Sequence, residues 1–283
     1  MQCRFRERTD LKPVHYLGAQ IDFRRADLMS RPGFFASTSF KAGFPGDSGI
    51  MEDRDWTSEN KDLLTHFSSH TNRTQSALWL DASIGASIPV KSLLYIKPFI
   101  SGSWMHFAFA VRDGSGIYAR PTDCTCEGVH YRQQCNSREE TYFPINENYY
   151  EYSFKGREVI RYQQDWLLLA SGFSVGTNYF RPFSFEFTFQ ISPFTYCAAV
   201  DEHIGSRTFR DYSAWGLFIE PKGRISFSIK RFDLSIEGGY RFIGRTKGPA
   251  YIESANSGSF SRIGDAGAGL SLMDLRFLAR YQF

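Results

Sequence analysis

The segment Pro182-Phe-Ser-Phe-Glu-Phe-Thr-Phe-Gln190 decides the fold class of this 283-residue chain. Phenylalanines occupy positions 183, 185, 187 and 189, and polar residues occupy the positions between them. Because side chains two residues apart in a β-strand point to the same side, the pattern predicts a strand with one aromatic face and one polar face.

The same alternation recurs along the chain. It runs from Leu78 to Ile88, from Phe34 to Phe44 and from Met273 to the terminal Phe283. A change of phase at Lys230-Arg231 predicts a tight hairpin turn. We expect nine strands, at about 12–25, 31–45, 73–89, 92–112, 154–180, 182–196, 211–230, 232–244 and 264–283.

The predicted connections alternate in length. Short links fall near 26–30, 90–91, 181 and 231, and long loops at 46–72, 113–153, 197–210 and 245–263, so all long loops lie at one end. Long apolar rows with this loop pattern predict an all-β, antiparallel transmembrane β-barrel with a polar interior. The alternative is a soluble β-sandwich or lipocalin-like barrel, whose apolar face would point inward.

The domain organisation is inferred from the number of predicted strands and from the first residues of the chain. Bacterial barrels have an even number of strands, so nine recognisable strands suggest ten, with the first one upstream beside an export signal. The first eight residues contain no apolar core of a signal peptide. We therefore expect residues 1–9 to be an uncertain start or linker and residues 10–283 to be a single outer-membrane barrel domain.

Composition excludes other classes. The net charge is +3, and Lys and Arg are scattered, so nucleic acid is not an expected partner. No apolar run reaches the roughly 18 residues of a membrane-spanning helix.

Two clusters of ionisable residues fall in predicted long loops at the same end. Met51–Trp56 contains Asp53 and Asp55, and the second cluster contains Asp201 and His203. In extended backbone each pair shares one side, so all four groups are expected to converge on the mouth of the barrel. Neighbouring carboxylates raise each other's pKa, and an Asp beside a His orients the imidazole and stabilises its protonated form, so this set can activate a water molecule.

These clusters, in this order, resemble those of the omptin family of outer-membrane proteases, and the similarity runs from Asp10-Leu11-Lys12-Pro13 to Phe283. The resemblance implies a ten-stranded barrel and an aspartic-type endopeptidase, with its active site at the extracellular mouth. It implies that His203 is the general base, Asp201 its orienting partner, and Asp53 and Asp55 the facing pair.

The resemblance also implies peptide or protein substrates, contact with outer-membrane lipid, a monomer, and no cofactor or metal. Omptins specific for basic residues carry an acid at the position of Ala199, so cleavage beside Arg or Lys is not expected. Asp165 replaces a basic residue that binds lipopolysaccharide, which leaves lipopolysaccharide dependence open.

Cysteines and the remaining histidines give weaker signals. For Cys135, a disulfide to Cys124 or Cys126 is favoured over a metal site with His130, and the connectivity, including Cys197, stays open. His66 and His70 have the spacing of a helical metal pair without the Glu of the zinc motif, so no zinc is expected there.

The leading function is therefore an outer-membrane endopeptidase. The alternative from another class is a non-catalytic omptin-like surface barrel, acting as an adhesin or structural protein. A porin is a weaker third reading, because a ten-stranded lumen is narrow enough to be filled by side chains.

Overall fold

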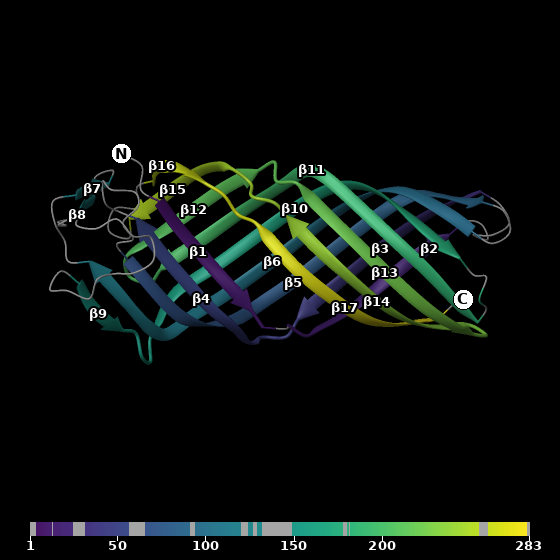
Figure 1. Ribbon diagram of the computed structural model, residues 1–283, viewed down its shortest axis with the longest axis horizontal. Helices are drawn as coiled ribbons and strands as arrows, with labels where there is room; N and C mark the ends of the chain where they lie inside the picture. Colours follow the sequence, from purple (N-terminus) through teal and green to yellow (C-terminus); the bar gives the residue numbers. More distant parts are fainter. Residues whose placement is uncertain are drawn as a thin grey trace.

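The computed structural model describes residues 4–12, 14–24, 32–56, 66–90, 94–119, 124–126, 129–131, 149–177, 180, 182–254 and 260–281. All regular elements within these ranges are β-strands (Figure 1). No helix in the described part of the chain is long and apolar enough to cross a bilayer.

The strands form nine passes along the sheet within the described residues, several of them divided into two named strands. The passes are β1 (Arg4–Leu11) with β2 (Tyr16–Arg24), β3 (Gly33–Gly43) with β4 (Gly46–Trp56), β5 (His66–Val90), β6 (Leu94–Ala119), β9 (Tyr149–Ser153) with β10 (Glu158–Thr177), β11 (Phe183–His203), β12 (Arg207–Ala214) with β13 (Phe218–Ile229), β14 (Phe232–Ile243) with β15 (Gly248–Ser254), and β16 (Phe260–Ala266) with β17 (Leu270–Tyr281). A separate hairpin joins β7 (Cys124–Cys126) and β8 (Val129–Tyr131).

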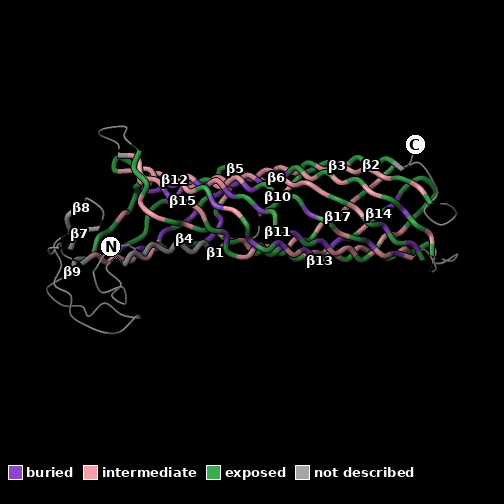
Figure 2. The backbone as a smooth tube through the Cα atoms, turned by 90° about the horizontal axis from the view of Figure 1, so that it is seen from above, coloured by how far each residue is buried: buried purple, intermediate pink, exposed green. Residues whose placement is uncertain are grey.

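Consecutive passes pair antiparallel, and the sheet rolls into an elongated tube (Figures 1 and 2). Within the described residues, the first and last passes are not hydrogen-bonded to each other. Their side chains nevertheless meet, since Arg280 Nη2 of the last pass lies 2.6 Å from Asp22 Oδ2 of the first. Lys41 Nζ of the second pass also reaches the last pass, at 3.3 Å from Asp274 Oδ2. The predicted all-β barrel fold class is confirmed, and so is the hairpin at Lys230-Arg231, where Ile229 pairs with Phe232.

The strands are longer than predicted. Much of the expected loop 46–72 belongs to β4 and β5, the loop 197–210 shrinks to a turn at 204–206, and 245–263 contains β15 and much of β16. Arg4–Thr9, expected to be a start or linker, pair with β4. The alternation of apolar and polar residues marks only the part of a strand whose outer face is apolar. Strand segments that are polar on both faces lack this alternation and were therefore predicted to be loops.

The outward apolar side chains form a belt around one part of the tube. The belt includes Phe34, Phe40, Leu80, Ile84, Ile88, Ile100, Leu167, Leu169, Phe183, Phe185, Phe187, Ile225, Leu234, Ile236, Met273, Leu275 and Phe277. A soluble sandwich or lipocalin-like barrel would bury these residues, so that alternative is wrong. Beyond the belt, the outward residues of β5 are Thr71, Arg73 and Gln75, which are polar and exposed.

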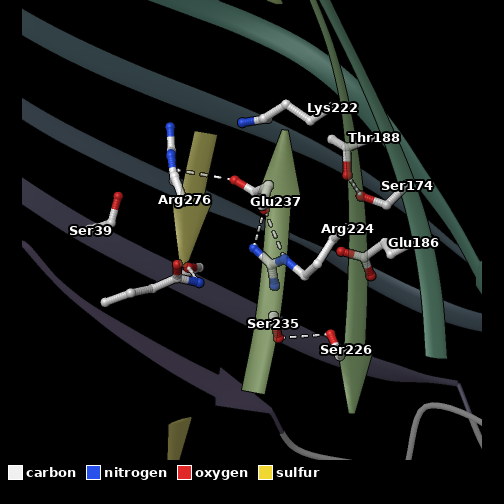
Figure 3. A network of polar contacts seen from close by, with 12 residues as sticks. Ser39, Ser174, Glu186, Thr188, Lys222, Arg224, Ser226, Ser235, Glu237 and Arg276 are labelled. Atoms are coloured by element: carbon white, nitrogen blue, oxygen red, sulfur yellow. Dashed lines mark hydrogen bonds and ion pairs between the residues drawn. The ribbon is translucent and has the colours of Figure 1, made fainter. Parts of the chain in front are cut away.

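The lumen inside the belt is polar, as predicted, and is filled by ion pairs (Figure 3). Arg241 Nε donates to Glu220 Oε1 at 2.7 Å, and both side chains are buried. Arg224 and Arg276 both bind Glu237, and Lys97 pairs with Glu186. Acids and bases thus compensate each other through this part of the tube.

Further along the lumen the interior is apolar, which differs from the prediction of a uniformly polar lumen. We call this cluster the plug; it contains Ala77, Trp79, Met105, Phe107, Phe109, Trp166, Leu168, Ala170, Cys197, Ala199, Phe218 and Ile243. Along β5, the plug residue Trp79 lies between His70 and the network residue Asp81. Strands that are apolar on both faces at this level, such as Trp166–Ala170, gave no signal of which side faced inward.

We expect Ile84→Arg to destabilise the folded protein by about 2–4 kcal/mol, because the charge would sit near the middle of the belt. Thr71→Arg, on the same face of β5 but beyond the belt, should change the free energy of unfolding by less than about 1 kcal/mol. Urea unfolding in lipid vesicles measures both. Equal stabilities would show that the belt does not face lipid.

We expect Arg241→Met to cost about 3–5 kcal/mol, because it leaves buried carboxylates without their cation. Arg262→Met breaks an exposed pair with Asp265 and should cost no more than about 1 kcal/mol. Denaturant unfolding in detergent compares the two variants. A similar small loss in both would contradict the stabilising role of the network.

Candidate active site

Asp201 and His203 lie at the end of β11, beyond the belt, on the face that points into the tube. Cys197 and Ala199 precede them on the same face and belong to the plug. His203 Nε2 donates to Asp201 Oδ2 at 2.9 Å. Because a carboxylate only accepts, Nε2 carries the proton, and Nδ1 of a neutral His203 is left as the basic nitrogen.

The walls beside this couple are aromatic. Asp201 pairs in register with Tyr162 on β10 and with Phe209 on β12. The ring of Phe209 meets the imidazole of His203 edge to face, with 5.4 Å between centroids. Asp201 itself is buried, so the couple is shielded on one side and open toward the mouth.

Asp53 lies on β4, where it pairs with Ser68 on β5. It shares its strand face with the buried Met51. Asp55 is two residues further along, opposite His66, and its side chain falls outside the described residues. Both aspartates are therefore in a regular strand rather than in the predicted loop.

His70, which the sequence analysis considered only as one of a metal pair, is a candidate site residue related to both clusters. It is 3% exposed, and its Nδ1 donates to the carbonyl of Asp113 at 2.7 Å. Burial lowers the pKa of His70; the Asp113 carbonyl and the charge of Asp53 oppose this shift, and the charge of His203 adds to it. His70 thus lies within the electrostatic reach of both Asp53 and His203.

A β-bulge sets the orientation of His70. The register between β5 and β6 shifts between Ser69 and Thr71, and opposite this point Asp113 and Gly114 adopt φ values of 55° and 96°. Bulges re-aim backbone and side chains near functional sites. Here the bulge turns the Asp113 carbonyl onto the imidazole of His70.

His66 and His70 do not form a helical pair. In a strand, four residues span about 13 Å, so the two rings lie on separate levels of the wall. Burial lowers the pKa of His66 to about 4, and the charge of Arg207 on β12 contributes. In the described part of the chain, no group of three His, Cys, Asp or Glu side chains is arranged to hold a metal ion.

The other residues singled out by sequence have separate positions. Cys197 is a buried free thiol, whereas the side chains of Cys124, Cys126, His130 and Cys135 lie outside the described residues. Asp165 accepts hydrogen bonds from His106 and Gln163.

A rolled antiparallel sheet with an outer apolar belt and an ionisable mouth defines an outer-membrane β-barrel. The omptin family model matches residues 8–283, and the chain belongs to the omptin family, whose members are outer-membrane proteases. The crystal structure of the outer membrane protease OmpT from Escherichia coli superposes with a TM-score of 0.69 at 17% identity, covering 88% of this chain and 79% of that one. No curated protein matches the sequence.

His66 makes the stability of the mouth pH-dependent. Its pKa of about 4 lies below that of an unfolded His, so the unfolded chain binds more protons and stability falls as pH drops from about 6.5 toward 4. In His66→Gln the decrease in the free energy of unfolding between pH 7.5 and pH 5 should be smaller, by on the order of 1–2 kcal/mol. Urea midpoints at pH 7.5 and 5 measure the difference; an equal loss in both proteins would contradict the burial of His66.

Proposed function

We propose that this protein is an outer-membrane endopeptidase that hydrolyses peptide bonds with a water molecule held between the Asp201–His203 couple and the Asp53–Asp55 pair. The observation that carries the proposal is the buried position of His70 on β5, where the charge of Asp53 raises its pKa and the charge of His203 lowers it. These two effects support one shared site for clusters that are 148 residues apart, counting from Asp53 to Asp201.

His203 is the proposed general base. With Nε2 bound to Asp201 at 2.9 Å, Nδ1 is the ring nitrogen that accepts a proton from the attacking water in this scheme. The imidazolium that forms then lies beside the Asp201 carboxylate, which stabilises its charge. When the leaving amine departs, the same nitrogen returns the proton to it.

Asp53 and Asp55 are the proposed partners on the facing wall. A shared proton between neighbouring carboxyl groups can be donated to the scissile carbonyl oxygen as it gains negative charge, and it returns to the pair when the carbonyl re-forms and the amine leaves. His70, fixed by the Asp113 carbonyl, is a positioning residue for Asp53. No cofactor is part of this scheme. The dependence of activity on lipopolysaccharide is measured separately in the experiment below.

The filled lumen supports a substrate that lies across the mouth. The plug and the ion-pair network occupy the tube below the site, which argues against a porin and against passage of a peptide through it. A chain lying across an open mouth can be cut internally, which is endopeptidase action. We infer that this mouth faces the cell exterior, where peptide and protein substrates are met, and that the barrel acts as a monomer.

We expect His203→Ala to lower the single-turnover cleavage rate by on the order of 10²- to 10⁴-fold, because it removes the base. Asp201→Asn should cost less, since it keeps a hydrogen-bonding group beside the imidazole. Asp53→Ala and Asp55→Ala should each be severe and should not add when combined, because groups acting as one unit are not additive.

A library of quenched fluorescent peptides, incubated with the full chain in lipid vesicles with and without lipopolysaccharide, provides the measurement. Unchanged circular dichroism of each variant is the folding control. Wild-type rates in His203→Ala would end the water-activation scheme. An inactive wild type with a folded barrel would favour the non-catalytic surface protein.

A further inference from the structure

Three polar side chains form a hydrogen-bonded chain on the outer wall of the tube, away from the mouth. Ser76 lies on β5, His106 on β6 and Asp165 on β10, and these three strands are neighbours in the sheet (Figure 1). His106 Nδ1 lies 3.0 Å from Asp165 Oδ1, and His106 Nε2 lies 3.1 Å from Ser76 Oγ. We call these residues the outer triad; the proposed peptide hydrolysis uses none of them.

Strand alternation places His106 and Asp165 on the outer face. Their neighbours along the chain, Met105, Phe107 and Trp166, are buried in the plug and point inward. Because successive side chains of a strand point to opposite faces, His106 and Asp165 point outward, where they also pair in register.

A β-bulge brings Ser76 to the same face. The register between β5 and β6 shifts between Thr74 and Ser76. The inward residues on either side of this point, Thr74 and Ala77, are both buried and are three positions apart instead of two. Gln75 and Ser76 therefore both lie on the outer side, and the bulge directs the Ser76 hydroxyl to His106.

The chemistry of the groups fixes the direction of each hydrogen bond. A carboxylate only accepts, so Nδ1 of His106 donates to Asp165, and Nε2 of the neutral ring accepts the proton of the Ser76 hydroxyl. Gln163 Nε2 donates to the other oxygen of Asp165 at 2.9 Å. Trp104 stacks on the imidazole, with 6.0 Å between centroids. A serine bonded to a histidine that an aspartate orients is the arrangement of an activated nucleophile.

The outer triad lies at the border between the belt and the polar outer wall. On β5 the belt residue Leu80 lies on one side of Ser76, and the exposed Arg73 lies on the other. On β10 the belt residue Leu167 is two positions from Asp165. The side chains of His106 and Asp165 are 17% and 32% exposed. This level of the wall corresponds to the interface between the hydrocarbon core and the lipid headgroups.

We propose that the outer triad is a second hydrolytic site, which cleaves the fatty-acyl esters of membrane lipids. The ester groups of lipids join the acyl chains to the headgroup region, which is the level of Ser76. This activity is independent of the mouth and goes beyond the proposed peptide hydrolysis.

The reaction proceeds in two halves. Ser76 Oγ bonds to the ester carbonyl carbon while its proton passes to His106 Nε2, and the lipid alcohol takes that proton as it leaves an acyl group on Ser76. Water then gives a proton to His106 Nε2 and bonds to the acyl carbon. The Ser76 oxygen leaves with that proton, which releases the fatty acid and restores the triad.

Covalent labelling identifies the nucleophile directly. The full chain carrying His203→Ala, which lacks the proposed base of peptide hydrolysis, is placed in vesicles of phosphatidylethanolamine and phosphatidylglycerol. An alkyl fluorophosphonate bonds to an activated serine oxygen and releases fluoride. We expect mass spectrometry to locate the adduct on Ser76, and adding Asp165→Asn to slow its formation by on the order of 10²- to 10⁴-fold.

Release of free fatty acid measures turnover. Vesicles of phospholipid alone and vesicles that also contain lipopolysaccharide distinguish the two sources of acyl ester, and release from either supports the site. Adding Ser76→Ala should reduce release to that of protein-free vesicles. Adding Ser171→Ala, which changes an exposed outer-face serine of β10, should leave it unchanged, with circular dichroism as the folding control.

Three results would overturn the proposal. They are an adduct that forms on another residue or not at all, no fatty acid release from either kind of vesicle, and equal release by Ser76→Ala and its parent. Because the parent already carries His203→Ala, none of these results bears on the proposed peptide hydrolysis.

Discussion

The whole structure depends on one constraint: a chain that crosses hydrocarbon must satisfy all its backbone hydrogen-bonding groups within itself. Strands can do this only by pairing along their length in a rolled sheet. Once the sheet is rolled, strict alternation assigns each side chain to lipid or to the lumen. The apolar belt and the charged lumen are therefore two consequences of the same backbone geometry.

The lumen is layered, and the layers explain where chemistry can occur. Inside the belt, ion pairs such as Arg241–Glu220 fill the tube, and the apolar plug closes it above them. In the described part of the chain, the candidate site residues Asp53, His70, Asp201 and His203 lie where the strands rise beyond the belt. There the outer faces of the strands are polar and do not contact lipid. Aspartates and histidines can therefore occupy inward positions of β4, β5 and β11.

The sequence predicted the belt well, because apolar residues at Phe183–Phe189 and Met273–Tyr281 recur at every second position, as expected for strands with one apolar face. It predicted the Asp201–His203 and Asp53–Asp55 pairs as candidates through spacing and family resemblance. It missed the strand extensions and the plug, because segments with two polar or two apolar faces carry no alternation. The place of His70 in the mouth was not predicted, because it depends on a bulge opposite Asp113 and Gly114.

The central claim is that Asp53 and His203 share one site, and the pKa of His70 reports on it directly. NMR titration of the histidines in micelles, in the wild type, Asp53→Asn and His203→Gln, measures that pKa. The account predicts that removing the Asp53 charge lowers the pKa of His70, because the carboxylate favours its charged form, and that removing His203 raises it, because a like charge is lost. A His70 pKa that is unchanged in both variants would contradict a shared site.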